Sequence, residues 1–157
     1  MRILVTGGAG FIGSHVADRF IELGHEVAVL DDLSSGKAEN VNPQAKLYRV
    51  SLLDERLAGV FGEFRPEVVS HHAAQVNVRR SVDAPEFDAT VNVVGSVRLF
   101  HAAVTRGCGK VIYASSGGAC YGEPPKLPAP EDTPVRPLCP YGVSKFVADS
   151  VVCITSE

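Results

Sequence analysis

Residues 1–15, MRILVTGGAGFIGSH, decide the fold. Arg2 to Thr6 is a short, mostly apolar run of the kind that forms a buried parallel strand. The pattern GxGxxG follows this run at Gly8, Gly10 and Gly13. The next apolar residues have the spacing of a helix, which Gly24 ends, and they are Phe11, Ile12, Val16, Phe20 and Leu23. A strand, a glycine-rich turn and a helix in this order form the context that a dinucleotide-binding fingerprint requires.

The fingerprint glycines have a geometric purpose. They permit a tight turn, let the backbone approach a pyrophosphate, and let the helix pack closely on its strand. The helix N-terminus then offers N–H groups and a partial positive charge, so no Lys or Arg is needed at this point. A glycine-rich turn without a ligand is the alternative, and the flanking strand and helix disfavour it.

Asp31 follows the second expected strand, Glu26 to Leu30, about 20 residues beyond the fingerprint. An acid at this position hydrogen-bonds the adenosine ribose and repels a 2′-phosphate, so NAD is favoured over NADP. The alternative is that Asp31 only caps its loop. The neighbouring Asp32 is the residue we expect to be merely solvated.

Apolar runs and helical patterns alternate along the rest of the chain, which is typical of βαβ units. The sequence predicts five strands, at residues 2–6, 26–30, 46–50, 67–71 and 110–115. After the first helix, it predicts others over Asp54–Phe64 with an acidic cap, over Pro85–Arg106, and from Tyr141 to about Cys153. Right-handed crossovers then give an α/β fold, a Rossmann-type doubly wound parallel sheet of order 3-2-1-4-5 with helices on both faces. Ligands bind such sheets at the carboxyl ends of strands 1 and 4.

Composition narrows the possible partners. The chain has 157 residues, 45% of them hydrophobic, and a net charge of −3, which suits one domain with no electrostatic attraction to nucleic acid or to an anionic membrane. No apolar run is long enough to span a bilayer, and Gly7 and Gly8 interrupt the first one, so we interpret it as a strand and not as a signal peptide.

The cysteines and histidines do not predict a metal site. The four cysteines are too widely spaced for a zinc pattern, so we expect reduced thiols in a cytoplasmic protein. His71 and His72 are adjacent on a strand and point to opposite faces, so they cannot easily share one ion. We expect one of them to be packed and the other, His72, to lie near the cofactor.

Tyr141 and Lys145 form a YxxxK motif at the start of the last helix, where one helical turn puts both side chains on one face. A lysine ammonium and an oxidised nicotinamide would stabilise the phenolate and lower the tyrosine pKa from about 10. The tyrosine could then take a proton from a hydroxyl while hydride leaves the same carbon. YxxxK alone is a weak motif, but here it follows a nucleotide fingerprint and a strand that ends in serines.

Six motifs together resemble one family across nearly the whole chain. They are VTGGAGFIGSH (Val5–His15), DDLSSGK (Asp31–Lys37), HHAAQVNVRRSV (His71–Val82), NVVGS (Asn92–Ser96), YASSGGACYG (Tyr113–Gly122) and PYGVSK (Pro140–Lys145). The family is the extended short-chain dehydrogenase/reductases, which include NAD-dependent epimerases and dehydratases, and the chain is most similar to the UDP-glucose 4-epimerase branch.

The resemblance implies a function and a set of contacts. It implies epimerisation of a nucleotide-sugar, with a UDP-sugar favoured, through transient oxidation at C4 by bound NAD, with Tyr141 as acid and base. It also implies a possible homodimer. The implied NAD contacts are Gly7, Gly10, Phe11, Ile12, Asp31, Ser35, Gly36, Ala73, Ala74, Asn92, Tyr141 and Lys145. To these we add the fingerprint residues Gly8 and Gly13, together with Ser51, Leu52 and His72.

Three departures from the family pattern matter. Gly117 stands where the family commonly has Ser or Thr, so either Ser115 or Ser116 is expected to orient the sugar. Ser51 stands where an Asp usually binds adenine. Family enzymes also continue into a C-terminal substrate domain, so we interpret residues 1–157 as a truncated NAD-binding Rossmann domain with little or no turnover alone.

Other functions remain open. A nucleotide-sugar dehydratase needs an acidic pair where this chain has Gly117-Gly118-Ala119, which disfavours it. A reductase of the same family and an NAD-binding module without turnover are the remaining alternatives.

Overall fold

The computed structural model describes residues 1–154, with side chains as far as residue 152. These residues form two compact units. The sheet unit comprises residues 1–74 and 98–114, and the helical unit comprises residues 75–97 and those from 115 onward.

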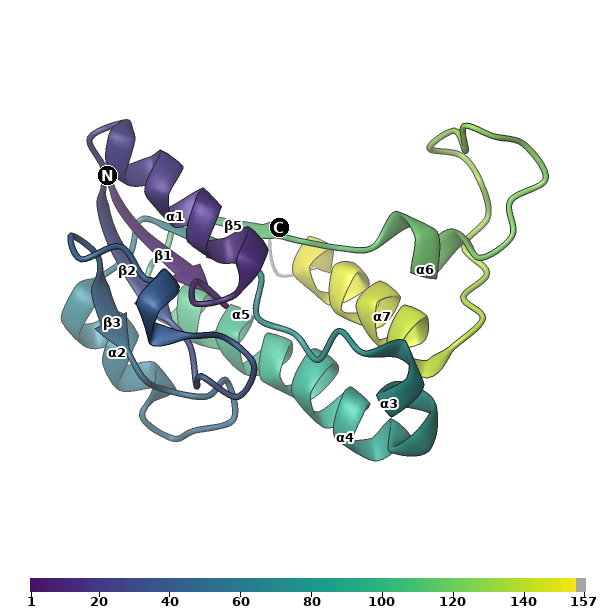
Figure 1. Ribbon diagram of the computed structural model, residues 1–157, viewed down its shortest axis with the longest axis horizontal. Coiled ribbons are helices and arrows are strands. Elements are labelled where there is room, and N and C mark those ends of the chain that lie inside the picture. The colour runs from purple at the N-terminus through teal and green to yellow at the C-terminus, as the bar shows by residue number, and fades with distance from the viewer. Residues whose placement is uncertain (155–157) are drawn as a thin grey trace. The chain divides into compact units, whose positions relative to one another are not determined.

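A five-stranded parallel sheet forms the sheet unit (Figure 1). Its strands, in chain order, are β1 (Arg2–Thr6), β2 (Glu26–Leu30), β3 (Lys46–Tyr48), β4 (Val68–His71) and β5 (Lys110–Tyr113). The spatial order is β3-β2-β1-β4-β5, and all four pairings are parallel. In the register, Leu4 of β1 lies between Ala28 and Val69. The predicted fold class and strand order are confirmed.

Helices flank both faces of this sheet. Helix α1 (Phe11–Glu22) lies on one face, while α2 (Leu57–Phe64) and the part of α5 (Gly95–Thr105) from residue 98 lie on the other (Figure 1). Alternate residues of a strand point to the same face, and a buried cluster against α1 contains Ile3, Val5, Ala17, Val27 and Val29. Burying each Val or Ile contributes about 1.5–3 kcal/mol, so this layer holds β1 and β2 firmly in place.

The helical unit is built around α7 (Pro140–Ile154). This helix packs against α3 (Val78–Asp83), α4 (Pro85–Ala89), the π-helical turn η2 (Thr90–Val94) and α6 (Gly117–Tyr121). Pro85 is the first residue of α4, where its missing N–H costs nothing. Asn77 caps α3, because its side chain accepts a 3.0 Å hydrogen bond from the Arg80 N–H.

Two predicted boundaries after β2 are wrong. The third strand ends at Tyr48 instead of Val50, because the Val50 N–H bonds the Tyr48 carbonyl and leaves the ladder. The following helix begins at Leu57 instead of Asp54, and Asp54 does not cap it. Its carboxylate bonds the N–H and the guanidinium of Arg56, which keeps this segment in a turn.

The later elements also differ in detail. The expected fourth strand begins one residue later, at Val68, and the fifth ends at Tyr113, which leaves the two serines outside it. The long helix predicted over Pro85–Arg106 is present but interrupted by η2. The short elements α6 and η1 (Ala38–Asn40) were not expected from the sequence.

No helix within residues 1–154 is both long and apolar enough to cross a membrane. The expectation of a reduced thiol at Cys153 concerns a side chain outside the described residues.

Candidate functional site

The glycine turn joins β1 to α1 in the form the sequence predicts. The Gly10 N–H donates to the Gly7 carbonyl at 3.1 Å, and Gly10 itself precedes the first helical residue without a side-chain cap. A Cβ on Gly13 would lie 2.2 Å from the Gly7 oxygen, so only glycine lets the helix start this close to the turn. The first turn of α1 carries no acidic residue, and its N-terminus is therefore suited to an anion.

Asp31 is bonded directly to this turn. Its Oδ2 accepts a 3.0 Å hydrogen bond from the Ala9 N–H, and its Oδ1 accepts one of 2.8 Å from the Leu33 N–H. A carboxylate offers about four acceptor positions, so two remain for hydroxyl groups. Asp31 therefore caps its loop and also retains the capacity to bind a ribose.

The segment that follows Asp31 is also hydrogen-bonded to the glycine turn, at Ala9. The Ala9 carbonyl accepts hydrogen bonds from the Lys37 N–H at 3.0 Å and from the Asn40 side-chain amide at 2.9 Å. The Lys37 ammonium pairs with Glu39 at 3.5 Å in a largely exposed position. The nearest cation to Asp31 in the sequence is thus already partnered by an acid.

Thr6 organises the end of β4. Its Oγ1 shares a 2.6 Å hydrogen bond with Nδ1 of His71 and accepts one of 3.2 Å from the Ala73 N–H. His71 is fully buried, whereas His72 is partly exposed and bonds the Ser70 hydroxyl through Nε2 at 2.9 Å. Of the two histidines, His71 is the packed one.

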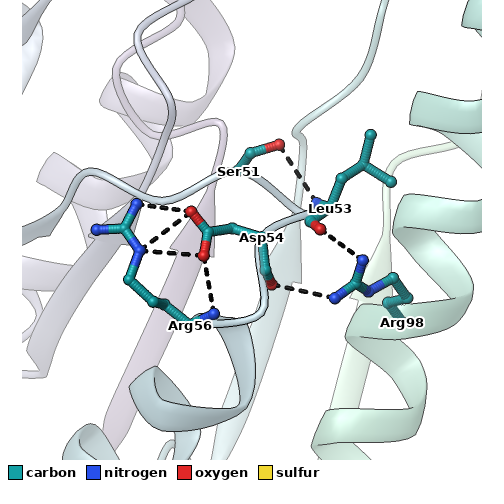
Figure 2. A network of polar contacts seen from close by, with 5 residues as sticks. All are labelled: Ser51, Leu53, Asp54, Arg56 and Arg98. Carbon is teal, nitrogen blue, oxygen red and sulfur yellow. Dashed lines mark hydrogen bonds and ion pairs between the residues drawn. The ribbon is translucent and has the colours of Figure 1, made fainter.

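The turn after β3 contains Ser51 and is contacted by two arginines, Arg56 and Arg98 (Figure 2). The Ser51 hydroxyl accepts from the Leu53 N–H at 3.3 Å, and Arg98 donates to the carbonyls of Leu53 and Asp54. Arg56 holds the pKa of the Asp54 carboxyl at about 2, mainly through their side-chain hydrogen bond. No local sequence pattern indicated these contacts of Arg98 and Arg56, because the charged head of a surface arginine is usually solvated.

Tyr141 is hydrogen-bonded to Ser116 in the helical unit. Ser116 precedes α6, whereas the Ser115 hydroxyl faces the Cys120 thiol at 3.9 Å. Of the two candidate serines, the structure pairs Ser116 with the tyrosine. The sequence left this choice open because both hydroxyls follow the same strand.

The protein's own groups raise the pKa of Tyr141, whereas the lowered pKa predicted from the sequence includes the charge of a bound nicotinamide. Burial raises it most, the Ser116 hydrogen bond lowers it, and the charges of Cys120 and Asp88 raise it further. The protein groups thus favour the neutral phenol. Burial also lowers the pKa of Lys145 to about 8, an effect partly offset by nearby acidic groups, and the side chain is 4% exposed.

Gly142 lets α6 and α7 meet beside Tyr141. A Cβ there would lie 2.3 Å from the Ala119 carbonyl oxygen, and the Gly142 carbonyl accepts a 3.7 Å contact from the Cys120 thiol. The glycine in YGVSK therefore has a packing reason, since this close approach brings the Ser116 and Tyr141 segments together.

Asn92 has a structural role in the helical unit. Its amide oxygen accepts from the Gln75 N–H at 2.8 Å, and its amide nitrogen donates to the Gln75 carbonyl at 2.9 Å and to Asp88 Oδ1 at 3.1 Å. The side chain is 1% exposed. These bonds engage both of its amide protons, so the expected cofactor contact from Asn92 lacks a free donor.

The predicted residues are divided between the two units. The sheet unit carries the expected dinucleotide contacts Gly7, Gly8, Gly10, Phe11, Ile12, Gly13, Asp31, Ser35, Gly36, Ser51, Leu52, His72, Ala73 and Ala74. The helical unit carries Asn92, Ser115, Ser116, Tyr141 and Lys145.

Phe11 and Ile12 are 80% and 65% exposed, which is unusual for apolar side chains at a helix start. Across the residues that could be searched, no three His, Cys, Asp or Glu side chains gather as a metal site would require.

A parallel sheet of this order, with a glycine turn and an acid after β2, is the Rossmann architecture typical of dinucleotide-binding domains. Residues 3–156 match the model of the NAD dependent epimerase/dehydratase family, and the chain belongs to that family.

Individual relatives agree with this assignment. The chain is 51% identical over 154 residues to a UDP-glucose 4-epimerase of Mycolicibacterium smegmatis, a match that covers 95% of this chain and 49% of that protein. A structure of the Thermotoga maritima UDP-glucose 4-epimerase with UDP-glucose matches 99% of this chain and 51% of its own, at a TM-score of 0.96 and 46% identity. The Thermus thermophilus enzyme in complex with NAD matches 98% and 50%, at a TM-score of 0.95 and 47% identity. The chain spans about half the length of the curated relatives it matches.

Proposed function

We propose that residues 1–157 form the NAD-binding domain of a nucleotide-sugar epimerase that acts on a UDP-sugar. The observation that carries this proposal is the bond between Asp31 and the glycine turn, which completes a site for a dinucleotide without a 2′-phosphate. The similarity to epimerases solved with NAD and with UDP-glucose supports the same reaction.

The sheet unit offers groups for the pyrophosphate, the adenosine ribose and the adenine of NAD. The N–H groups at the start of α1 suit the pyrophosphate, and the remaining lone pairs of Asp31 suit the adenosine ribose. Ser51 and Leu52 are the proposed adenine contacts, and His72, Ala73 and Ala74 follow β4 at the sheet edge where such ligands bind. When bound, NAD would supply a reversible hydride acceptor for C4 of the sugar.

Tyr141 is the proposed acid and base. Ser116 holds its hydroxyl by a hydrogen bond and can also orient a sugar hydroxyl. With a pKa of about 8, Lys145 is mostly an ammonium at neutral pH, so it can stabilise the phenolate as the proton leaves.

Two alternatives are less well supported. A dehydratase would need carboxylates in the segment that forms the first turn of α6, and Gly117, Gly118 and Ala119 have none. An NAD-binding module without turnover keeps the sheet-unit site but leaves the Tyr141–Ser116 pair unexplained.

We also propose a cytoplasmic location and a homodimer. Cys108, Cys120 and Cys139 are free thiols, as a reducing compartment requires. The homodimer rests on family resemblance alone, and the molecular mass in solution would test it.

The test of this function has two stages. Calorimetric titration with NAD comes first, and conversion of UDP-galactose to UDP-glucose by the NAD-loaded protein is then followed by NMR. We expect NAD binding, and any turnover should be abolished by Tyr141→Phe but kept by Tyr48→Phe, which alters a tyrosine on β3. Turnover that survives in Tyr141→Phe would contradict the proposed role of this tyrosine, whereas the absence of NAD binding would exclude both the epimerase domain and the module.

A further inference from the structure

Asp88 is a buried carboxylate at the centre of the helical unit. It is 0% exposed and accepts three hydrogen bonds, from Gln75 Nε2 at 2.8 Å, from Asn92 Nδ2 at 3.1 Å and from the Ser144 hydroxyl at 2.6 Å. A buried carboxylate is costly unless donors surround it in this way. The short bond to Ser144 is a charge-assisted one.

The groups that donate to Asp88 are also hydrogen-bonded to one another. The Gln75 amide exchanges hydrogen bonds with the Asn77 backbone at 2.6 and 3.0 Å, and its own backbone pairs with Asn92. These bonds hold the side-chain amides of Gln75 and Asn92 in the orientation in which they donate to the Asp88 carboxylate. Asp88 is a rigid anchor, because its acceptor atoms cannot move without breaking several buried bonds.

Ser144 connects this anchor to the YxxxK motif. It lies three residues after Tyr141 and one before Lys145 on α7, and it is 4% exposed. With 3.6 residues per helical turn, fixing the direction of one side chain fixes the rotation of its neighbours about the helix axis. The bond from Ser144 to Asp88 therefore constrains the rotation of α7 about its axis, and with it the directions of both motif side chains.

We propose that Asp88, acting through Ser144, is the positioning residue that holds Tyr141 and Lys145 in register for proton transfer. This role rests on the proposed function of that pair. Asp88 does not itself exchange a proton in this reaction. Its carboxylate also contributes negative charge near Lys145, as does Asp149 of the same helix.

The first test follows Tyr141 without any ligand. The four tyrosines are replaced by 3-fluorotyrosine, and the Tyr141 signal in the 19F NMR spectrum is assigned by its loss in Tyr141→Phe. In Ser144→Ala we expect this signal to shift by more than its linewidth while the Tyr48 signal stays in place. Ser150→Ala is the matched control, because Ser150 is an exposed serine of α7 whose hydroxyl donates to the Phe146 backbone carbonyl at 3.0 Å. It should move no signal.

The second test follows Lys145. Asp88→Asn preserves the shape of the side chain and removes its charge, so more of the Lys145 amine becomes neutral. Acylation of Lys145 by acetic anhydride at neutral pH, measured by peptide mass spectrometry, should accelerate by about threefold or more.

A purely structural role gives a different result. If both variants lose thermal stability while the Tyr141 signal and the Lys145 acylation rate remain unchanged, the positioning role is wrong. Neither readout needs NAD or a sugar, so a failed NAD titration would overturn the proposed function without affecting this result.

Discussion

The backbone N–H of Ala9 donates a 3.0 Å hydrogen bond to Asp31 Oδ2, which joins the glycine turn to the residue that follows β2. One carboxylate therefore shapes the turn that would receive the pyrophosphate and faces the position of the adenosine ribose. Affinity and nucleotide specificity should change together when this side chain changes.

Replacing Asp31 by Asn should lower the affinity for NAD by about tenfold or more, because hydrogen bonds to a charged group contribute about 1.5–3 kcal/mol. The preference for NAD over NADP should also shrink, since the repulsive charge is gone. Calorimetric titration with both nucleotides measures this. Asp32→Asn is the control, because that exposed carboxylate accepts from the Ser34 N–H and makes no bond to the turn. Unchanged affinities in Asp31→Asn would remove Asp31 from the site.

Gly13→Ala should disrupt the turn, because the new Cβ would lie 2.2 Å from the Gly7 carbonyl oxygen. We expect NAD affinity to fall by at least about tenfold, which corresponds to 1.4 kcal/mol. Gly59→Ala is the matched control. This glycine lies inside α2 with nothing within 4 Å of an added Cβ, so alanine should stabilise the fold by about 0.5–1 kcal/mol. Equal NAD affinities in the two variants would contradict the proposed close approach at Gly13.

Arg98→Met should loosen the turn that contains Ser51, since its guanidinium donates to two carbonyls there. Denaturant unfolding should show a loss of about 1–2 kcal/mol, and NAD should bind more weakly. Arg56→Met removes the exposed pair with Asp54 and should leave both quantities close to wild type. A loss of affinity in Arg56→Met equal to that in Arg98→Met would mean that the carbonyl contacts are unimportant.

Lys145 should make the free energy of unfolding depend on pH in the alkaline range. Its pKa falls from 10.5 to about 8 on folding because of burial, so above pH 8 the unfolded chain binds more protons than the folded one. The contribution of Lys145 to the free energy of unfolding therefore increases with pH, by about 2 kcal/mol between pH 7 and pH 10. Urea unfolding of wild type and Lys145→Met at both pH values isolates the effect. An identical pH dependence in the two proteins would show that Lys145 is not buried as described.

Much of the fold could be predicted from the sequence, because apolar runs and the glycine fingerprint are local signals. The strand order followed from the handedness of crossovers, and the turn and Asp31 followed from their spacing. The π-turn at η2 could not be predicted in this way. Asn92 lies in this turn and bonds Asp88 and Gln75, and a local pattern does not reveal a contact with Gln75, 17 residues away.

The same reason explains the site residues that were missed. Asp88, Ser144 and Arg98 have ordinary helical positions in the sequence, and their roles arise only from contacts with distant segments. The choice of Ser116 over Ser115 and the direction of the Tyr141 pKa likewise depend on burial and on α6, which no local pattern indicated.

The central claim is that a dinucleotide binds on the glycine turn with its ribose at Asp31. A crystal structure of the protein with NAD tests it most directly. We predict the pyrophosphate at the N-terminus of α1 and the adenosine ribose hydroxyls within hydrogen-bonding distance of the Asp31 carboxylate. A dinucleotide bound elsewhere on the protein, or a ribose that does not contact Asp31, would contradict the account.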